Sequence, residues 1–196
     1  VSDSSKFIDF EFPANLASLG TPKPGRCWIS EDQKASVQWY RIPELLALSG
    51  SLASGEEMKL SLDDVDPTDL TQGTIGNCWL VATVAALAEF PAAVRRLFVD
   101  VNPAVGRYVI KIYDMNQAQW QEVVIDDYIP CLLEYDWSSA PYRVSETGLK
   151  VYNYSDIYNA DGTKKLPQRW RPLFGQPKAS KIWALLLEKA MAKYLG

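Results

Sequence analysis

The residue with the clearest chemical potential in this chain is Cys78. It follows a loop that contains Gly73 and Gly76, and it opens an apolar stretch that we expect to be helical. The N-terminus of a helix carries partial positive charge and unpaired N–H groups, which favour the thiolate form of a cysteine placed there. Thiolate is the form of cysteine that acts as a nucleophile. The position of Cys78 therefore predicts a nucleophile held at the start of a helix.

Gln72 lies in the loop that leads to Cys78. Its side-chain amide can donate two hydrogen bonds. When a thiolate attacks a carbonyl, negative charge develops on the carbonyl oxygen, and aligned N–H donors stabilise it. The Gln72 amide and the backbone N–H of Cys78 are candidates for that pair of donors. The alternative is that Cys78 is a small core residue without chemistry, because free cysteine is among the most buried residue types.

The segment that must hold Cys78 is expected to be a helix over 78–90. It is apolar almost all round, which is typical of a helix buried in a protein core. Asn77 is the expected N-cap, and Pro91 is expected to end this helix or to start the next one, over about 91–99.

Further elements complete an α+β pattern. Two β-rich segments, 106–114 and 119–125, flank a polar turn and predict an antiparallel hairpin. A last helix is predicted over about 179–195, and its core-facing residues at helical spacing are Ile182, Trp183, Leu186, Leu187, Ala190, Met191 and Tyr194. Residues 1–60 are expected to be an arm that wraps the core, with a short helix near 43–48, and 61–196 to form the main unit.

The region around Cys78 resembles the nucleophile region of calpains, the intracellular papain-like cysteine proteases. Their pattern is Gln-Gly, two residues, Gly, an acidic residue, then Cys-Trp and an apolar helix. Three other segments resemble calpain segments in the same order: 10–15, 121–127 and 183–190. The resemblance implies a papain-like half-domain, helix-rich with a buried nucleophile helix and a small antiparallel sheet. It also implies that Cys78 is the nucleophile and Gln72 the oxyanion-hole donor. Asn77 stands where the family commonly has aspartate.

The chain contains no histidine. A cysteine protease of this type needs a base that takes the thiol proton and later protonates the leaving amine. The resemblance implies that a catalytic histidine and its orienting asparagine come from a downstream second half of the protease core. Because the chain starts at Val1 and stops at Gly196, we interpret it as a fragment of a longer protein, and we expect it to be inactive alone.

The resemblance further implies a calcium site, in which an aspartate before the Gln-Gly pair and a glutamate before the late tryptophan share the ion. Asp69 matches the aspartate and is a candidate ligand, but Lys181 stands at the partner position. One hypothesis is that the Lys181 ammonium pairs with Asp69 and replaces the ion. The alternative is that Lys181 is solvated and Asp69 caps the loop. The acidic stretch 63–69 is not an EF-hand, since it lacks the required glycine and glutamate. No cofactor is required for the chemistry.

Residues 131–177 depart most from the calpain pattern. The corresponding calpain segment is shorter, whereas this one is rich in aromatic residues. One interpretation is a packed surface elaboration, because loops accept insertions readily. The other is a surface for docking or substrate gating, because exposed aromatic residues favour recognition.

Composition restricts the remaining partners. The formal net charge is −4 and no basic run suits nucleic acid. The apolar stretch 78–90 is too short to span a membrane. The three cysteines, Cys27, Cys78 and Cys131, have no zinc-like spacing. We expect no disulfide and a cytoplasmic or otherwise intracellular location.

Three functions are compatible with these observations. The preferred one is part of a calpain-like endopeptidase that hydrolyses peptide bonds in intracellular proteins through an acyl-enzyme. A non-catalytic calpain-like scaffold that binds proteins is the main alternative. A cysteine acyltransferase with chemistry similar to that of transglutaminases is the third.

Overall fold

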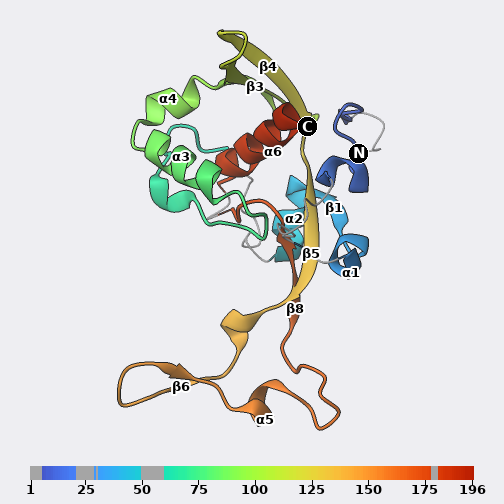
Figure 1. Ribbon diagram of the computed structural model, residues 1–196, viewed down its shortest axis with the longest axis vertical. Helices are drawn as coiled ribbons and strands as arrows, with labels where there is room; N and C mark the ends of the chain where they lie inside the picture. The colour runs from blue at the N-terminus through green and yellow to red at the C-terminus, as the bar shows by residue number, and fades with distance from the viewer. Residues whose placement is uncertain (1–5, 21–28, 30, 50–59, 178–180) are drawn as a thin grey trace.

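The computed structural model describes residues 6–20, 29, 31–49, 60–177 and 181–196, and it is mixed α+β, as predicted (Figure 1). The helices are η2 (Leu16–Leu19), α1 (Glu31–Ala35), α2 (Ile42–Ser49), η3 (Pro67–Asp69), α3 (Cys78–Ala88), α4 (Pro91–Arg95), η4 (Trp137–Ser139), α5 (Tyr154–Ile157) and α6 (Trp183–Leu195). The strands are β1 (Gln38–Arg41), β2 (Phe98–Asn102), β3 (Arg107–Asp114), β4 (Gln119–Asp126), β5 (Tyr128–Tyr135), β6 (Arg143–Val144), β7 (Lys150–Val151) and β8 (Gln168–Pro172).

The predicted hairpin is the core of an antiparallel sheet in the order β2-β3-β4. Strands β3 and β4 pair from Arg107 opposite Asp126 to Asp114 opposite Gln119. The predicted helix over 91–99 was wrong in its second part, because α4 ends at Arg95 and Phe98–Asn102 pairs with β3. This strand contains β-branched residues that suit a sheet, and pairing with β3 satisfies its backbone groups.

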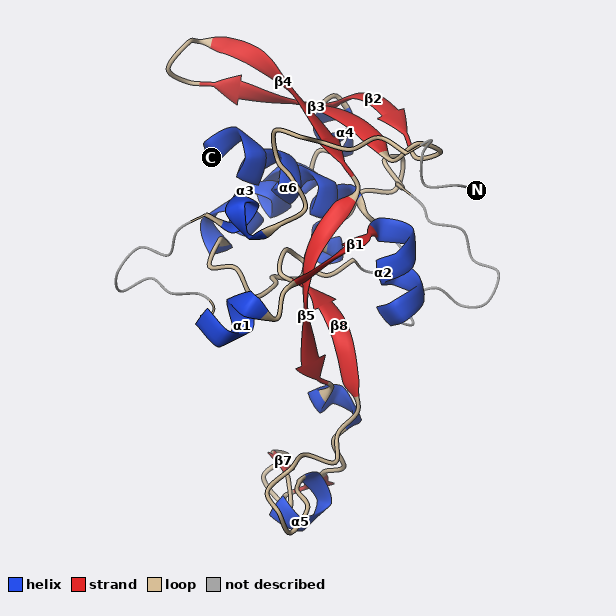
Figure 2. Cartoon of the chain, turned by 90° about the vertical axis from the view of Figure 1, so that its right-hand side faces the viewer, coloured by secondary structure: helices blue, strands red, loops and turns tan. Residues whose placement is uncertain are grey.

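A second antiparallel sheet, in the order β1-β5-β8, joins distant parts of the sequence. Central strand β5 pairs with β1 of the N-terminal region on one side and with β8 on the other. Both β5 and β8 overlap the segment 131–177 that departs from the calpain pattern. Beyond them, residues 136–167 extend away from the rest of the protein and carry β6, β7 and α5 (Figures 1 and 2). This excursion has its own small buried cluster of Ala140, Ile157 and Leu166.

Helix α3, which begins at Cys78 as predicted, is buried on one face only. Leu80, Val84 and Ala88 lie in the main core, whereas Trp79 is 55% exposed. The helix thus packs in the core as expected, but along one face and not all round. The apolar character of the sequence does not distinguish a helix covered on every side from one that presents an apolar face to solvent.

Helix α6 is the most buried element of the protein. Every residue from Trp183 to Ala190 is buried, including Glu188 and Lys189. The helix begins at Trp183, later than the predicted start at 179, and residues 179 and 180 lie outside the described residues. A helix with so much buried surface must provide partners for its charged residues, because an unpaired buried charge is very costly.

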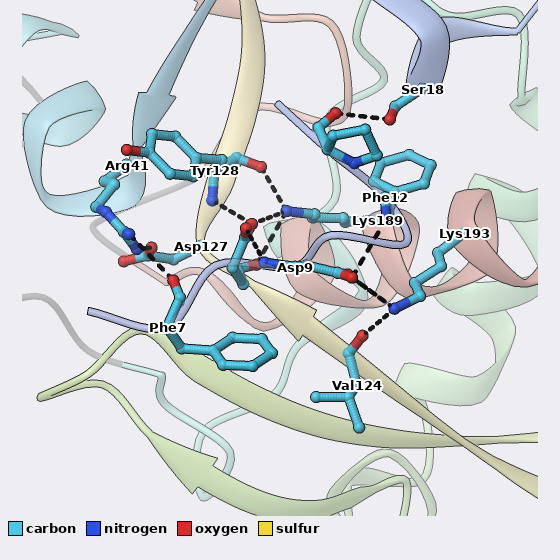
Figure 3. Close-up of polar contacts among 12 residues, drawn as sticks. Phe7, Asp9, Phe12, Ser18, Arg41, Val124, Asp127, Tyr128, Lys189 and Lys193 are labelled. Atoms are coloured by element: carbon cyan, nitrogen blue, oxygen red, sulfur yellow. Dashed lines mark hydrogen bonds and ion pairs between the residues drawn. The ribbon is translucent and has the colours of Figure 1, made fainter. Parts of the chain in front are cut away.

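Lys189 attaches α6 to the junction between β4 and β5 (Figure 3). Its ammonium contacts the Asp126 carboxylate and donates to the backbone oxygens of Asp126 and Tyr128, at 3.1 and 2.7 Å. Burial lowers the pKa of Lys189, while Asp126 opposes that shift. The other carboxylate oxygen of Asp126 accepts the backbone N–H of Asp9 at 2.9 Å, and Lys193 binds Asp9 at 2.8 Å. These contacts bind the N-terminal segment around Asp9 to β4 and α6.

Among the described residues, no helix combines the length and the apolar character that crossing a membrane requires.

We expect Lys189→Met to lower the free energy of unfolding by about 3 kcal/mol, because it leaves the Asp126 carboxylate buried without its cation. The control is Arg107→Met, which breaks the solvent-exposed pair with Asp100 and should cost less than about 1 kcal/mol. Urea denaturation of the two variants and the unchanged chain measures both values. Equal decreases in the free energy of unfolding for the two variants would show that the buried pair contributes no more to stability than the exposed one.

Candidate active site

Cys78 lies at the first position of α3, and its side chain is exposed and not in a disulfide. The backbone oxygen of Asn77 accepts from the N–H groups of Leu80 and Val81, at 2.8 and 3.1 Å, which closes the first helical turn. The N–H groups that precede them have no partner inside the helix. The sulfur is thus accessible to a reacting molecule at the positive end of a helix.

Gln72 is also exposed, in the loop before α3. Its side-chain Nε2 lies 3.5 Å from the backbone oxygen of Ile75, at the long limit of a hydrogen bond. This weak contact keeps the amide near the loop and leaves it able to turn toward an incoming oxygen. The role of Gln72 as an oxyanion donor stays a prediction.

The loop 71–77 is held by backbone hydrogen bonds to the segment that follows β8. Ile75 donates to the oxygen of Leu173 at 3.1 Å, and Gln176 donates to the oxygen of Thr71 at 3.0 Å. The two segments approach so closely that only glycine fits at position 73. The glycine of the Gln-Gly pair therefore permits this packing.

Asn77 occupies the N-cap position of α3, but its side chain makes no capping hydrogen bond. The predicted cap is wrong in this respect, because the Asn77 amide donates to Glu188 on α6 at 2.8 Å instead. The Glu188 carboxylate also accepts the backbone N–H of Gly175, at 3.1 Å to each oxygen. Burial raises the pKa of Glu188, while the hydrogen bonds from Asn77 and Gly175 oppose the shift.

Sequence reasoning missed Glu188. The sequence pattern predicts it neither as a core residue nor as part of the site, although it lies within the most apolar stretch of α6. A carboxylate among residues that must all be buried is a signal that it has a specific partner. That partner, Asn77, is far away in the sequence, so only the fold reveals it.

A cavity of about 430 Å³ adjoins the start of α3. Its walls include Asn77 and Glu188, and they are otherwise mostly apolar. The apolar side chains that line it are Leu19, Ile75, Trp79, Leu80, Phe174, Met191, Ala192 and Leu195. Asn77 and Trp79, which flank Cys78 in the sequence, line this hollow, whereas Cys78 is not among its lining residues. Its apolar walls are suited to an apolar side chain.

Asp69 and Lys181 are in direct contact. The Lys181 ammonium is 3.2 Å from each carboxylate oxygen of Asp69 and 2.9 Å from a carboxylate oxygen of Asp64. Partial burial opposes the charge of Lys181, but the hydrogen bonds to Asp64 and Asp69 raise its pKa. Asp69 also accepts the indole N–H of Trp183 at 3.2 Å and caps η3 through the N–H of Asp66. Asp69 thus pairs with Lys181 and also caps η3, although the two contacts are alternatives in the prediction from the sequence.

The other cysteines are not part of this region. Cys131 on β5 is free and completely buried, and burial raises its pKa strongly. Cys27 lies outside the described residues. Within the part of the chain that the structure describes, no group of three or more metal-ligating side chains is present.

Comparison with known proteins gives a consistent result. Residues 7–146 match the family described as "Calpain family cysteine protease". The chain is 31% identical to calpain-12 of Homo sapiens over 132 residues, which is 63% of this chain and 16% of that protein. It is 27% identical to calpain-14 of Homo sapiens over 192 residues, which is 97% of this chain and 21% of that protein. It is 33% identical over 128 residues to the calpain-type cysteine protease DEK1 of Arabidopsis thaliana, covering 64% of this chain and 6% of that protein. The matches thus cover only a minor part of these relatives.

We expect Gly73→Ala to disturb the loop before Cys78, because an added Cβ would lie 1.9 Å from the backbone oxygen of Phe174. Gly76→Ala is the matched control in the same loop, since nothing lies within 4 Å of the position of its Cβ. Thermal unfolding and the rate of Cys78 alkylation should change in the first variant and stay unchanged in the second. Similar behaviour of the two variants would contradict the tight packing of the loop.

Proposed function

Because this chain belongs to the calpain family of cysteine proteases, we propose that it is the nucleophile-bearing half of a calpain-like endopeptidase that hydrolyses peptide bonds in intracellular proteins. The observation that supports this proposal most directly is the free and exposed thiol of Cys78 at the N-terminus of α3. A buried thiol would be inert, whereas this one can be reached by a peptide.

The proposed chemistry assigns two roles to this chain. The Cys78 thiolate attacks the carbonyl carbon of the peptide, and the new C–S bond forms a tetrahedral intermediate. The Gln72 amide and the N–H of Cys78 would donate to the negative oxygen. Collapse of the intermediate breaks the C–N bond and leaves a thioester, which water then hydrolyses. The histidine that moves the protons would come from a second half of the protease core, as the family resemblance implies, since this chain has none.

The exposed apolar face of α3 supports the need for that second half. Trp79 is 55% exposed directly after the nucleophile, and Phe90 beyond the helix is 67% exposed. An exposed tryptophan next to the candidate nucleophile is available for contact with a partner or domain. We therefore expect the second half to pack near the start of α3, where it would also complete the site.

In the full-length protein, we expect a thiol-reactive active-site probe to label Cys78, and Cys78→Ala to lower kcat/KM for peptide cleavage at least about a thousandfold. Cys131→Ala is the control and should leave labelling intact, because the Cys131 thiol is buried. Residues 1–196 alone should cleave no peptide. Labelling without cleavage would favour the scaffold function, whereas transfer of an acyl group to an amine in product analysis would favour an acyltransferase.

We further propose that the protein does not use calcium at Asp69. The ammonium of Lys181 already lies between the carboxylates of Asp64 and Asp69, where it supplies the positive charge that they require. A divalent cation placed there would be repelled by that ammonium. The residues present therefore do not fit a calcium ion, and no step of the proposed chemistry depends on one.

Calorimetry should detect no tight calcium binding at this site in the unchanged protein, whereas Lys181→Glu should gain binding, because a third carboxylate replaces the cation. Lys181→Met is the control, since it removes the positive charge without adding a ligand. Tight binding by the unchanged protein that disappears in Asp69→Ala would contradict the proposal.

A further inference from the structure

We propose that Glu188 is a positioning residue for the nucleophile: from the protein interior it orients Asn77, and through Asn77 it sets the placement of Cys78. The inference deepens the proposed function, on which its catalytic part rests. It concerns the neighbour of the nucleophile in the sequence and a buried carboxylate on a different helix, which the fold brings into contact.

The contact between the two residues is direct and partly buried. The Asn77 amide nitrogen lies 2.8 Å from Oε2 of Glu188, and the Glu188 side chain is 2% exposed. Helix α6 is rigidly packed over this stretch, since its residues 183–190 are all buried. Asn77 therefore hydrogen-bonds to a fixed point, and the residue that follows it in the chain is Cys78.

The same carboxylate also holds the other side of the loop. Both Glu188 oxygens accept the N–H of Gly175, and the next residue, Gln176, donates to the oxygen of Thr71 at 3.0 Å. A Cβ at position 175 would lie 2.5 Å from Oε1 of Glu188 and 3.0 Å from the oxygen of Thr71. Glu188 thus fixes the end of the loop 71–77 through Asn77 and its beginning through the segment 175–176.

The polarity of the contact depends on Asn77. An amide donates to a carboxylate, and such charge-assisted hydrogen bonds are strong where apolar groups exclude water. An aspartate at position 77 would instead place two carboxyl groups in contact, and they would have to share a proton or separate. The pair can be exchanged: with aspartate at 77 and glutamine at 188, the donor and the acceptor trade places and the hydrogen bond returns.

The experiment is a reciprocal exchange in the full-length protein. We compare the unchanged protein, Glu188→Gln, Asn77→Asp and the double variant by the rate at which iodoacetamide alkylates Cys78, followed by mass spectrometry over a range of pH. We expect each single change to slow alkylation about tenfold, because Asn77→Asp removes the donor and Glu188→Gln replaces a charge-assisted hydrogen bond with a weaker neutral one. The double variant should be about tenfold faster than Asn77→Asp. These two variants carry the same residue beside Cys78, so their difference reports the contact and not the added charge.

Asp127→Asn is the matched control, because it makes the same carboxylate-to-amide change at an equally buried site that pairs with Arg41. It should lower the unfolding temperature without slowing alkylation. Unchanged alkylation in Glu188→Gln, or a double variant no faster than Asn77→Asp, would overturn the proposal. Should Glu188→Gln fail to fold, Asn77→Ala removes the same donor at a partly exposed position, and its unchanged alkylation would overturn the proposal equally.

Peptide cleavage by the same variants separates this inference from the proposed function. Where cleavage occurs, kcat should follow the alkylation rates while KM changes little, because the contact acts on the nucleophile and not on substrate binding. If no variant cleaves peptides but alkylation shows the exchange pattern, the positioning role of Glu188 stands and the endopeptidase proposal fails.

Discussion

Two neighbouring charged residues on α6, Glu188 and Lys189, connect the interior of this protein to its distant parts. Both side chains are buried, and they reach different partners. Glu188 contacts the start of α3 and the segment after β8, whereas Lys189 contacts the junction of β4 and β5. Because a buried charge without partners is strongly unfavourable, each of these residues requires its partner segment to be in place. Helix α6 therefore positions the elements that contact these two residues.

The candidate nucleophile, Cys78, depends on this arrangement without being buried by it. Cys78 is exposed, yet the loop before it is bonded to the segment 173–176, and its neighbour Asn77 is bonded to Glu188. A reactive group has to be accessible and also held in one orientation, and these requirements conflict for a surface side chain. Here the Cys78 side chain is exposed, whereas the residues on its N-terminal side make the contacts with Glu188 and with the segment 173–176.

The ion pair of Lys181 shows how one substitution changes a charged site. In a site with two carboxylates, mutual repulsion favours a bound cation, whereas here the protein itself provides the cation. Lys181 lies just before α6, and its ammonium binds Asp64 and Asp69 in the region before the loop. Lys181, Trp183 and Glu188 thus all connect the region of the loop to α6 and the residues just before it.

The local elements and the candidate nucleophile could be predicted from the sequence, because they depend on neighbours along the chain. The helix after Cys78, the hairpin of β3 and β4 and the core-facing residues of α6 follow from apolar spacing and from turn residues. The strand β2, the pairing of β1 with β5 and the contact of Asn77 with Glu188 could not be predicted. Each of these contacts joins segments whose sequences do not indicate their partner. Which face of α3 is exposed likewise depends on how distant segments pack against the helix. The sequence by itself determined which groups could react; the tertiary structure decided which of them meet, because contacts between distant residues arise only when the chain packs.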